Sequence, residues 1–201
     1  EQTDHTDYIR YEGPGWESDK IGYRFYLDWR NATDIFGKLT DTMVLQNVGQ
    51  VGAKSYHEPA PWGMDVFKVG ESLGIGSVGM WQNNKVNMVS ATDSVTCRIA
   101  LNGNLQSLVE TNYYGWKVED KKYTLASDLA IFAGSRLTRH DLRIDDPLSN
   151  LCTGIILNDS VVVFTNNEDT TSKFVYFGTW GWQSLNKDNL GPAVIVNRND
   201  L

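Results

Sequence analysis

The residues best suited to chemistry concentrate in one stretch, residues 55–68 (SYHEPAPWGMDVFK). His57 lies next to Glu58 and close to Asp65, and a histidine beside a carboxylate is the usual pair for moving protons. Prolines at positions 59 and 61 exclude a continuous helix and disfavour a central strand. A loop with so many titratable groups is costly to bury, so we expect it to line a cleft in which Trp62 contacts a ligand. The alternative is a surface loop in which Trp62 fills the core.

A second segment, residues 12–19 (EGPGWESD), has the same mix of glycine, proline, tryptophan and carboxylates. We treat Trp16 within it, and Arg10 just before it, as candidate ligand-binding residues. Residues 23–30 (YRFYLDWR) then alternate strictly, as a strand does, with Arg24 on a polar and partly aromatic face. That face suits a polar ligand. The alternative is a solvated outer face with cross-strand ion pairs.

Two further segments carry candidate ligand-binding or proton-transferring side chains. Alternation in residues 135–143 (SRLTRHDLR) places Arg136 and His140 on one face, where they suit a carboxylated or sulfated ligand. The alternative is a surface strand with ordinary charges. Tyr114 and Trp116 in residues 112–117 (NYYGWK), like the aromatics of residues 177–182 (FGTWGW), can stack on sugar rings, and a tyrosine can also transfer a proton. We predict that His57, Asp65, Arg136 and His140 share one cleft.

No cofactor is predicted, because the chain lacks a phosphate-binding loop and a compact metal-ligand spacing. A metal held by His57, Asp65 and His140 is the less favoured alternative, with Glu58 able to replace Asp65. Cys97 and Cys152 lie in strand-like contexts, and we favour free thiols over a disulfide.

Composition narrows the possible partners. The chain has 201 residues, 41% of them hydrophobic, and a net charge of −7 without a basic block. The scattered lysines and arginines argue against nucleic acid as a partner. No apolar run approaches the length of a membrane span.

The elements that must position these residues are strands. Period-two alternation, with turn signals at residues 82–84, 102–104, 119–121 and 158–160, predicts one all-β domain over residues 1–201, an antiparallel sandwich or barrel. The expected strands span residues 23–30, 42–48, 77–81, 85–90, 94–101, 105–113, 123–133, 136–144, 155–158, 161–165, 174–180 and 193–197, with short helical turns at 34–38 and 183–190.

Several motifs resemble a bacterial family of domains of unknown function, DUF4861. These are residues 7–18 (DYIRYEGPGWES), 23–31, 56–66, 68–76 (KVGESLGIG) and 134–138 (GSRLT). The resemblance implies an exported, periplasmic or secreted protein of polysaccharide utilisation. It also implies a β-sandwich like that of galactose mutarotase. Family members are longer, so it implies a further strand-rich segment after Leu201.

Three functions are compatible with these residues. The first is an enzyme that cleaves uronate-containing oligosaccharides by β-elimination, as a lyase or dehydratase. Arg136 or Arg10 would then neutralise the carboxylate, His57 or His140 would act as base, and Tyr114 or Tyr56 as acid. The second is a mutarotase-like or hydrolytic enzyme in which His57 shares proton transfer with Glu58 or Asp65. The third is a non-catalytic sugar-binding module.

Overall fold

The chain folds into antiparallel strands throughout the described part. The computed structural model describes residues 9–201, and within that range there is no α-helix. The prediction of an all-β, antiparallel fold is confirmed. The strands are β1 (Gly15–Glu17), β2 (Gly22–Phe25), β3 (Thr33–Lys38), β4 (Gly63–Asp65), β5 (Ile75–Gln82), β6 (Lys85–Met88), β7 (Ser94–Asn102), β8 (Gln106–Val118), β9 (Lys121–Phe132), β10 (Thr138–Ile144), β11 (Leu151–Ile155), β12 (Val161–Thr165), β13 (Phe174–Trp182), β14 (Asn189–Leu190) and β15 (Ala193–Asn197). Three 3₁₀ turns accompany them: η1 (Arg10–Glu12), η2 (Leu45–Asn47) and η3 (Arg198–Asp200).

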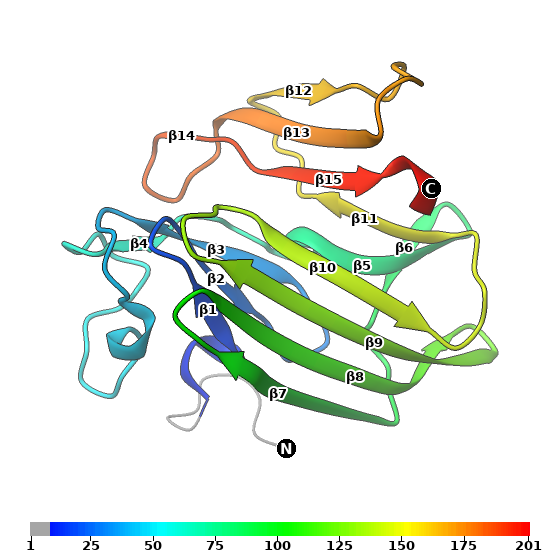
Figure 1. The fold of residues 1–201 in the computed structure, drawn as a ribbon, viewed down its shortest axis with the longest axis horizontal. Coiled ribbons are helices and arrows are strands. Elements are labelled where there is room, and N and C mark those ends of the chain that lie inside the picture. The colour runs from blue at the N-terminus through cyan, green and yellow to red at the C-terminus, as the bar shows by residue number, and fades with distance from the viewer. Residues whose placement is uncertain (1–8) are drawn as a thin grey trace.

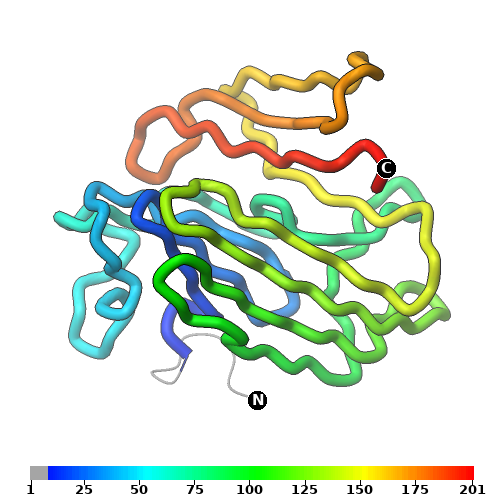
Figure 2. The backbone as a smooth tube through the Cα atoms, viewed as in Figure 1, coloured from blue at the N-terminus to red at the C-terminus, as the bar shows by residue number. Residues whose placement is uncertain are grey.

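The hydrogen-bonded ladders form four sheets (Figure 1), whereas a simple sandwich would have two continuous ones. Their strand orders are β1-β2-β3-β4, β10-β9-β8-β7, β11-β5-β6 and β12-β13-β14, with β15 also paired to β13. The long strands β7 to β10 lie side by side, and the last sheet lies beyond β11, as the backbone trace in Figure 2 shows.

The main core lies where the β7–β10 sheet faces β1, β2 and β5. It joins Trp16 and Phe25 of the N-terminal sheet to Val109, Trp116 and Leu125 of β8 and β9. A smaller cluster occupies the other face of the N-terminal sheet, where Phe36 of β3 meets residues around η1 and η2. Both faces of β2 and β3 are therefore buried, and a polar side chain there needs internal partners.

The predicted strand over residues 23–30 is wrong in its second half. The strand ends at Phe25, and residues 27–30 form a turn. Asp28 causes the turn: its Oδ1 accepts a hydrogen bond from the Arg30 backbone N–H at 2.8 Å, and its carbonyl accepts one from Asn31. Aspartate favours turns for this reason. Asn31 completes the turn with a φ of 44°.

Three other predicted segments also differ. Residues 34–38 are strand β3, not a helical turn. Residues 42–48 are not a strand, because the Glu17 carboxylate accepts the backbone N–H groups of Val44 and Leu45 at 2.8 and 2.7 Å. Residues 183–190 are not helical, because the Leu185 N–H bonds the distant Val66 carbonyl at 2.9 Å. The last two differences come from contacts between segments far apart in sequence.

The predicted hairpin turn at residues 82–84 is present. Asn83 and Asn84 have φ values of 55° and 58° between β5 and β6, as a two-residue hairpin turn requires. The predicted strand at 155–158 lies earlier, as β11. Cys97 and Cys152 are free thiols. No helix in residues 9–201 is long and apolar enough to cross a membrane.

Candidate functional site

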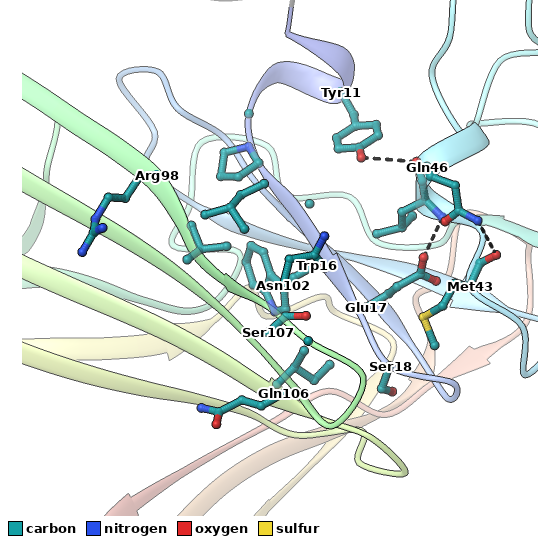
Figure 3. Close-up of a pocket in the computed structure, with 18 of the residues that line it drawn as sticks. Tyr11, Trp16, Glu17, Ser18, Met43, Gln46, Arg98, Asn102, Gln106 and Ser107 are labelled. Carbon is teal, nitrogen blue, oxygen red and sulfur yellow. Dashed lines mark hydrogen bonds between the residues drawn. The ribbon is translucent and has the colours of Figure 1, made fainter.

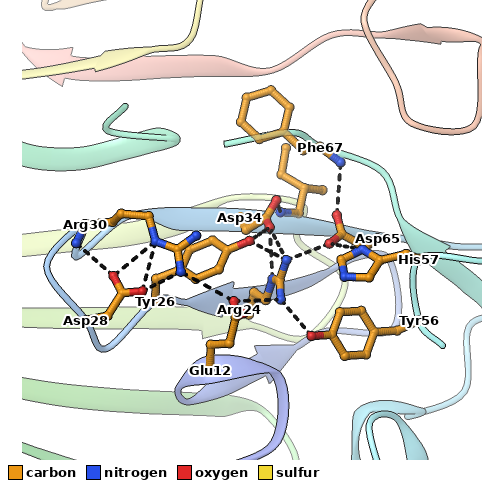
Figure 4. A network of polar contacts seen from close by, with 11 residues as sticks. Glu12, Arg24, Tyr26, Asp28, Arg30, Asp34, Tyr56, His57, Asp65 and Phe67 are labelled. Carbon is orange, nitrogen blue, oxygen red and sulfur yellow. Dashed lines mark hydrogen bonds and ion pairs between the residues drawn. The ribbon is translucent and has the colours of Figure 1, made fainter. Parts of the chain in front are cut away.

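Sheet register brings a guanidinium and two carboxylates to one face of the N-terminal sheet. Arg24 of β2 lies directly opposite Asp34 of β3, and Phe36 of β3 lies directly opposite Asp65 of β4. Positions opposite one another, or two apart, share a face, so Arg24, Asp34 and Asp65 point to the same side. We call the group around them the polar network; its members are Glu12, Arg24, Tyr26, Asp34, Tyr56, His57 and Asp65 (Figure 4).

Arg24 is the centre of the polar network, with a side chain only 2% exposed. Its Nη2 lies 2.8 Å from Asp34 Oδ2 and 2.7 Å from Asp65 Oδ2, so the two carboxylates share one nitrogen. Its Nε also donates to Asp34, at 2.9 Å, and its Nη1 donates to the Tyr56 hydroxyl at 3.2 Å. Tyr26 also accepts from Nη2 and donates to Asp34 Oδ2 at 2.8 Å.

The burial of the two carboxylates shifts their titration. Burial, reinforced by the charge of Asp34 and opposed by Arg24, raises the pKa of Asp65 from 3.8 to about 7. Burial also raises the pKa of Asp34. Asp65 therefore exchanges a proton near neutral pH, although it accepts the Phe67 backbone N–H at 3.2 Å as well.

His57 connects this buried charge to the surface. Its side chain is 53% exposed, and its Nδ1 lies 3.1 Å from Asp65 Oδ2. The loop that carries it is fixed by backbone hydrogen bonds, since the Asp65 N–H donates to the Tyr56 carbonyl at 2.8 Å. A neutral imidazole that donates its Nδ1 proton to Asp65 carries the lone pair on Nε2, the tautomer needed in a general base.

Tyr56 stands beside His57, with ring centroids 4.4 Å apart. Burial raises the pKa of its hydroxyl, while the charge of Arg24 opposes that rise. The hydroxyl therefore keeps its proton at neutral pH, and Arg24 is placed to stabilise the oxyanion formed if that proton is given away. A candidate general base, His57, and a candidate general acid, Tyr56, thus lie side by side next to the buried guanidinium and carboxylates.

The edge of the polar network is formed by η1 and the turn after β2. Glu12 Oε2 lies 3.5 Å from Arg24 Nη1 and 3.6 Å from Arg30 Nη2. Arg30 also pairs with Asp28, its Nε lying 2.9 Å from Oδ2, and it lies over the Tyr26 ring at 3.7 Å from the centroid. These pairs hold Arg30 in place next to the site.

A separate pocket of about 760 Å³ lies between β1, η2 and the β7–β8 hairpin (Figure 3). Its walls include Tyr11, Trp16 and Glu17, but neither His57 nor Asp65. Glu17 is already bonded there to two backbone N–H groups and to Lys38 Nζ at 2.7 Å. The pocket offers space, whereas the polar network offers reactive groups, so we take the polar network as the candidate site.

The structure does not gather the predicted cluster of His57, Asp65, Arg136 and His140. Tyr23 and Arg24 are neighbours in β2 and point to opposite faces. Arg24 reaches Asp65, whereas the Tyr23 hydroxyl donates to the Arg136 carbonyl at 2.6 Å. His140 lies between strands instead, with Nε2 2.7 Å from Ser127 Oγ and Nδ1 3.2 Å from the Gly76 carbonyl. Burial lowers the pKa of His140, which favours a neutral, structural imidazole.

The other predicted residues divide between the core and the surface. Trp16 and Trp116 are buried, and their indole N–H groups donate to Thr138 Oγ1 and to the Met88 carbonyl. Trp62 packs against Phe36 in the smaller cluster, 5.9 Å between ring centroids. Arg10 donates to the Gln46 carbonyl at 2.8 Å.

Glu58 and Tyr114 are exposed. In the described part of the chain, no group of three histidine, cysteine, aspartate or glutamate side chains is placed to hold a metal, so His140 does not complete a site with His57 and Asp65.

Asp34 and Tyr26 are central to the site but were not among the predicted site residues. Tyr26 was visible on the polar face of residues 23–30, whereas Asp34 fell in a segment expected to be helical. The missing information was the hairpin register that places Asp34 opposite Arg24. That register depends on the turn at residues 27–30.

One family model matches the chain, and it covers all of it. Its description is "Domain of unknown function (DUF4861)", and the match spans residues 1–201. No curated protein and no solved structure matches the chain.

Proposed function

We propose, from the premise that the chain belongs to the family DUF4861, that it is a carbohydrate-active enzyme whose chemistry is proton transfer by His57. The proposed reaction is β-elimination in a uronate-containing oligosaccharide, as a lyase or dehydratase. The observation that carries the proposal is the half-exposed imidazole 3.1 Å from a fully buried carboxylate. Perturbed titratable groups of this kind are typical of catalytic sites.

In the proposed step, His57 Nε2 removes the C5 proton of the uronate. The electron pair of the C5–H bond forms the C4–C5 double bond, and the C4–O bond breaks with its electrons passing to the leaving oxygen. Tyr56 donates its hydroxyl proton to that oxygen, and Arg24 stabilises the tyrosinate through its Nη1, 3.2 Å away. Asp65 stabilises the imidazolium, and solvent returns the protons to their starting positions.

Mutarotation is the second candidate, and a specific observation favours it. Elimination benefits from a cation at the substrate carboxylate, and the two arginines expected there are placed elsewhere: Arg10 holds backbone carbonyls of the η2 turn, and the Arg136 backbone lies on the other side of the sheet. Mutarotation of a neutral sugar needs only an acid and a base, which His57 and Tyr56 supply.

Ultraviolet absorbance separates the two reactions. Elimination produces a double bond conjugated to the carboxylate, so we expect absorbance to rise when the wild-type protein acts on a uronate-containing oligosaccharide. The His57→Ala variant should give no rise with the same oligosaccharide. A change in optical rotation without absorbance would favour mutarotation instead. If neither signal appears with neutral or acidic oligosaccharides, the enzyme proposal fails and a sugar-binding module becomes the better interpretation.

The proposal extends to fold type and location. We infer that the β7–β10 sheet and the sheets behind it form the two layers of a galactose-mutarotase-like sandwich. The shared core of Trp16, Phe25, Val109 and Leu125 supports this inference, as does the bridge between Thr33 and Gly74 that connects β3 to the start of β5. A periplasmic or secreted location in polysaccharide utilisation rests on the family resemblance; fractionation of cells that produce the native protein would test it.

A further inference from the structure

One face of the β12–β13–β15 sheet carries large apolar side chains that stay about half-exposed within residues 9–201, although Gly191 lies against the Trp180 ring. Alternate residues of a strand share a face, and directly paired residues of neighbouring strands do too. Trp180 of β13 pairs with Val162 of β12, and Tyr176 of β13 pairs with Ile195 of β15. We call this surface the aromatic face; its large side chains are Val162, Phe164, Phe174, Tyr176, Trp180, Trp182 and Ile195.

The side chains of the aromatic face are exposed by between 40% and 61%. None of them belongs to either core cluster. The opposite face of the same sheet is covered only in part: Thr179 is 2% exposed and Val194 lies next to Gly76 of β5, whereas Val163 and Phe177 are 42% and 36% exposed. Contiguous exposed apolar side chains point to an interaction surface, and seven large ones lie together on this side of the sheet.

The aromatic face also lacks charge. The remaining outward positions of the three strands and β14 are Gly178, Asn189, Ala193 and Asn197. A cation borders the face, where Lys173 Nζ lies 5.5 Å from the centroid of the Phe174 ring. In a chain of net charge −7, a face without charged side chains suits an uncharged ligand, because no charge has to be desolvated on binding.

Trp180 and Trp182 of the aromatic face differ from the core tryptophans in the hydrogen bonding of their indole N–H groups. The indole N–H groups of Trp16 and Trp116 donate to partners inside the protein. Within the described residues, the N–H groups of Trp180 and Trp182 have no such partner. Each therefore presents an apolar ring together with an available donor, which matches a sugar, whose C–H face is apolar and whose rim carries hydroxyl acceptors. A purely apolar partner would leave these donors buried and unsatisfied.

The centre of the face has small residues on β13 and β15, whereas Phe164 of β12 lies opposite Gly178. Gly178 and its partner Ala193 lie between Tyr176 and Trp180, whose Cα atoms are roughly 13 Å apart at the rise of about 3.3 Å per residue in a strand. The rings of Tyr176 and Trp180, on either side of these small residues, can contact an extended glycan chain along its apolar faces.

We propose that the aromatic face binds an uncharged stretch of a glycan chain by ring stacking, apart from the His57 site. The proposal rests on the proposed function for its substrate class, but it requires binding and no turnover. Stacking on Trp180 and Trp182 would retain a polysaccharide while another part of it reaches the catalytic residues. Self-association of two copies through the same face is the competing occupant, and the experiment distinguishes it.

The test is affinity electrophoresis in gels that contain hydroxyethyl cellulose, xyloglucan or galactomannan, with polygalacturonate as an acidic comparison. We expect retardation by at least one uncharged polymer. The Trp180→Ala/Trp182→Ala variant should bind that polymer at least about tenfold more weakly, a loss of about 1.4 kcal/mol. Trp81→Ala is the matched control, because Trp81 is 50% exposed on β5 outside this face, and it should bind as the wild type does.

Three outcomes would overturn the proposal: no retardation by any uncharged polymer, equal retardation of the double variant, or a concentration-dependent dimer in light scattering that the double variant abolishes. The last would assign the face to a second copy. His57→Ala separates this proposal from the proposed function, because it should bind the polymer normally. Binding that persists in a protein without any turnover would leave the aromatic face assigned and the enzyme proposal rejected.

Discussion

Asp34 and Asp65 approach the same nitrogen of Arg24, with Asp34 Oδ2 2.8 Å and Asp65 Oδ2 2.7 Å from Nη2. One buried cation therefore pairs with two buried carboxylates, and one of these, Asp65, also contacts the half-exposed His57. This arrangement gives Arg24 a structural role beside its contact with Tyr56, and it gives Asp65 a titrating one. Stability and catalysis should thus respond differently to substitutions at neighbouring positions of one network.

Arg24→Gln should be strongly destabilising, because it leaves two buried carboxylates facing each other without a cation. Loss of one partner from a buried charge pair costs about 3–5 kcal/mol. Urea unfolding at pH 7 measures the free energy of unfolding. Arg139→Gln is the control, since Arg139 is 62% exposed in its pair with Asp141, and it should change that free energy by no more than about 0.5 kcal/mol. A loss below about 1 kcal/mol for Arg24→Gln would contradict the buried-pair interpretation.

Asp65→Asn should change how stability depends on pH. The pKa of Asp65 is raised from 3.8 in the unfolded chain to about 7 in the fold, so between these values the folded state binds more protons than the unfolded state. This carboxyl therefore lowers stability as pH rises from about 4 to about 7, by at most about 1.4 kcal/mol per pH unit, and has no further effect above that range.

The measurement is urea unfolding from pH 4 to pH 8. The free energy of unfolding of Asp65→Asn minus that of the wild type should rise across this window and then become constant. A difference that grows towards acid pH would show that the Asp65 pKa is lowered, contrary to our interpretation.

Sequence alternation predicted which side of the strand at residues 23–26 is polar, but not that this side is buried. Strict alternation from Tyr23 to Tyr26 correctly placed Arg24 and Tyr26 on one side of the strand. Periodicity does not show which faces a sheet covers, and both faces of β2 are buried. The same limit affected His140, which we expected on an open face and which bonds the Gly76 carbonyl between strands.

The candidate site was predictable only in the part that lies close together in sequence. His57 lies in the loop that leads into β4 and Asp65 ends that strand, so their association follows from the loop folding back on the strand it precedes. Arg136 and His140 are remote from this loop, and only the sheet order decides on which side of Arg24 they lie. Asp34 needed the hairpin register, which the Asp28 turn sets.

His57→Ala should abolish most turnover while leaving the fold intact. General acid–base groups contribute about a hundredfold to ten-thousandfold in rate, and the half-exposed imidazole contributes little packing. On any oligosaccharide that the wild type converts, kcat should fall by that factor, with the unfolding midpoint nearly unchanged. Glu58→Ala, an exposed neighbour in the same loop, should keep wild-type turnover. Full activity of His57→Ala would assign the chemistry to another site.

Tyr56→Phe should identify the general acid, because a leaving group that departs without a proton does not need one. The substitution removes the hydroxyl that accepts from Arg24 Nη1 at 3.2 Å, at a cost of about 1 kcal/mol in stability. With an alkoxide leaving group, we expect kcat to fall about a hundredfold to ten-thousandfold. With a 4-nitrophenol leaving group, which departs without a proton, the loss should shrink to less than about tenfold. His57→Ala should show no such rescue, since the C5 proton must still be removed, and Tyr114→Phe should resemble the wild type with both substrates. An equal loss for Tyr56→Phe with both leaving groups would mean that this tyrosine positions the substrate and that the proton comes from elsewhere.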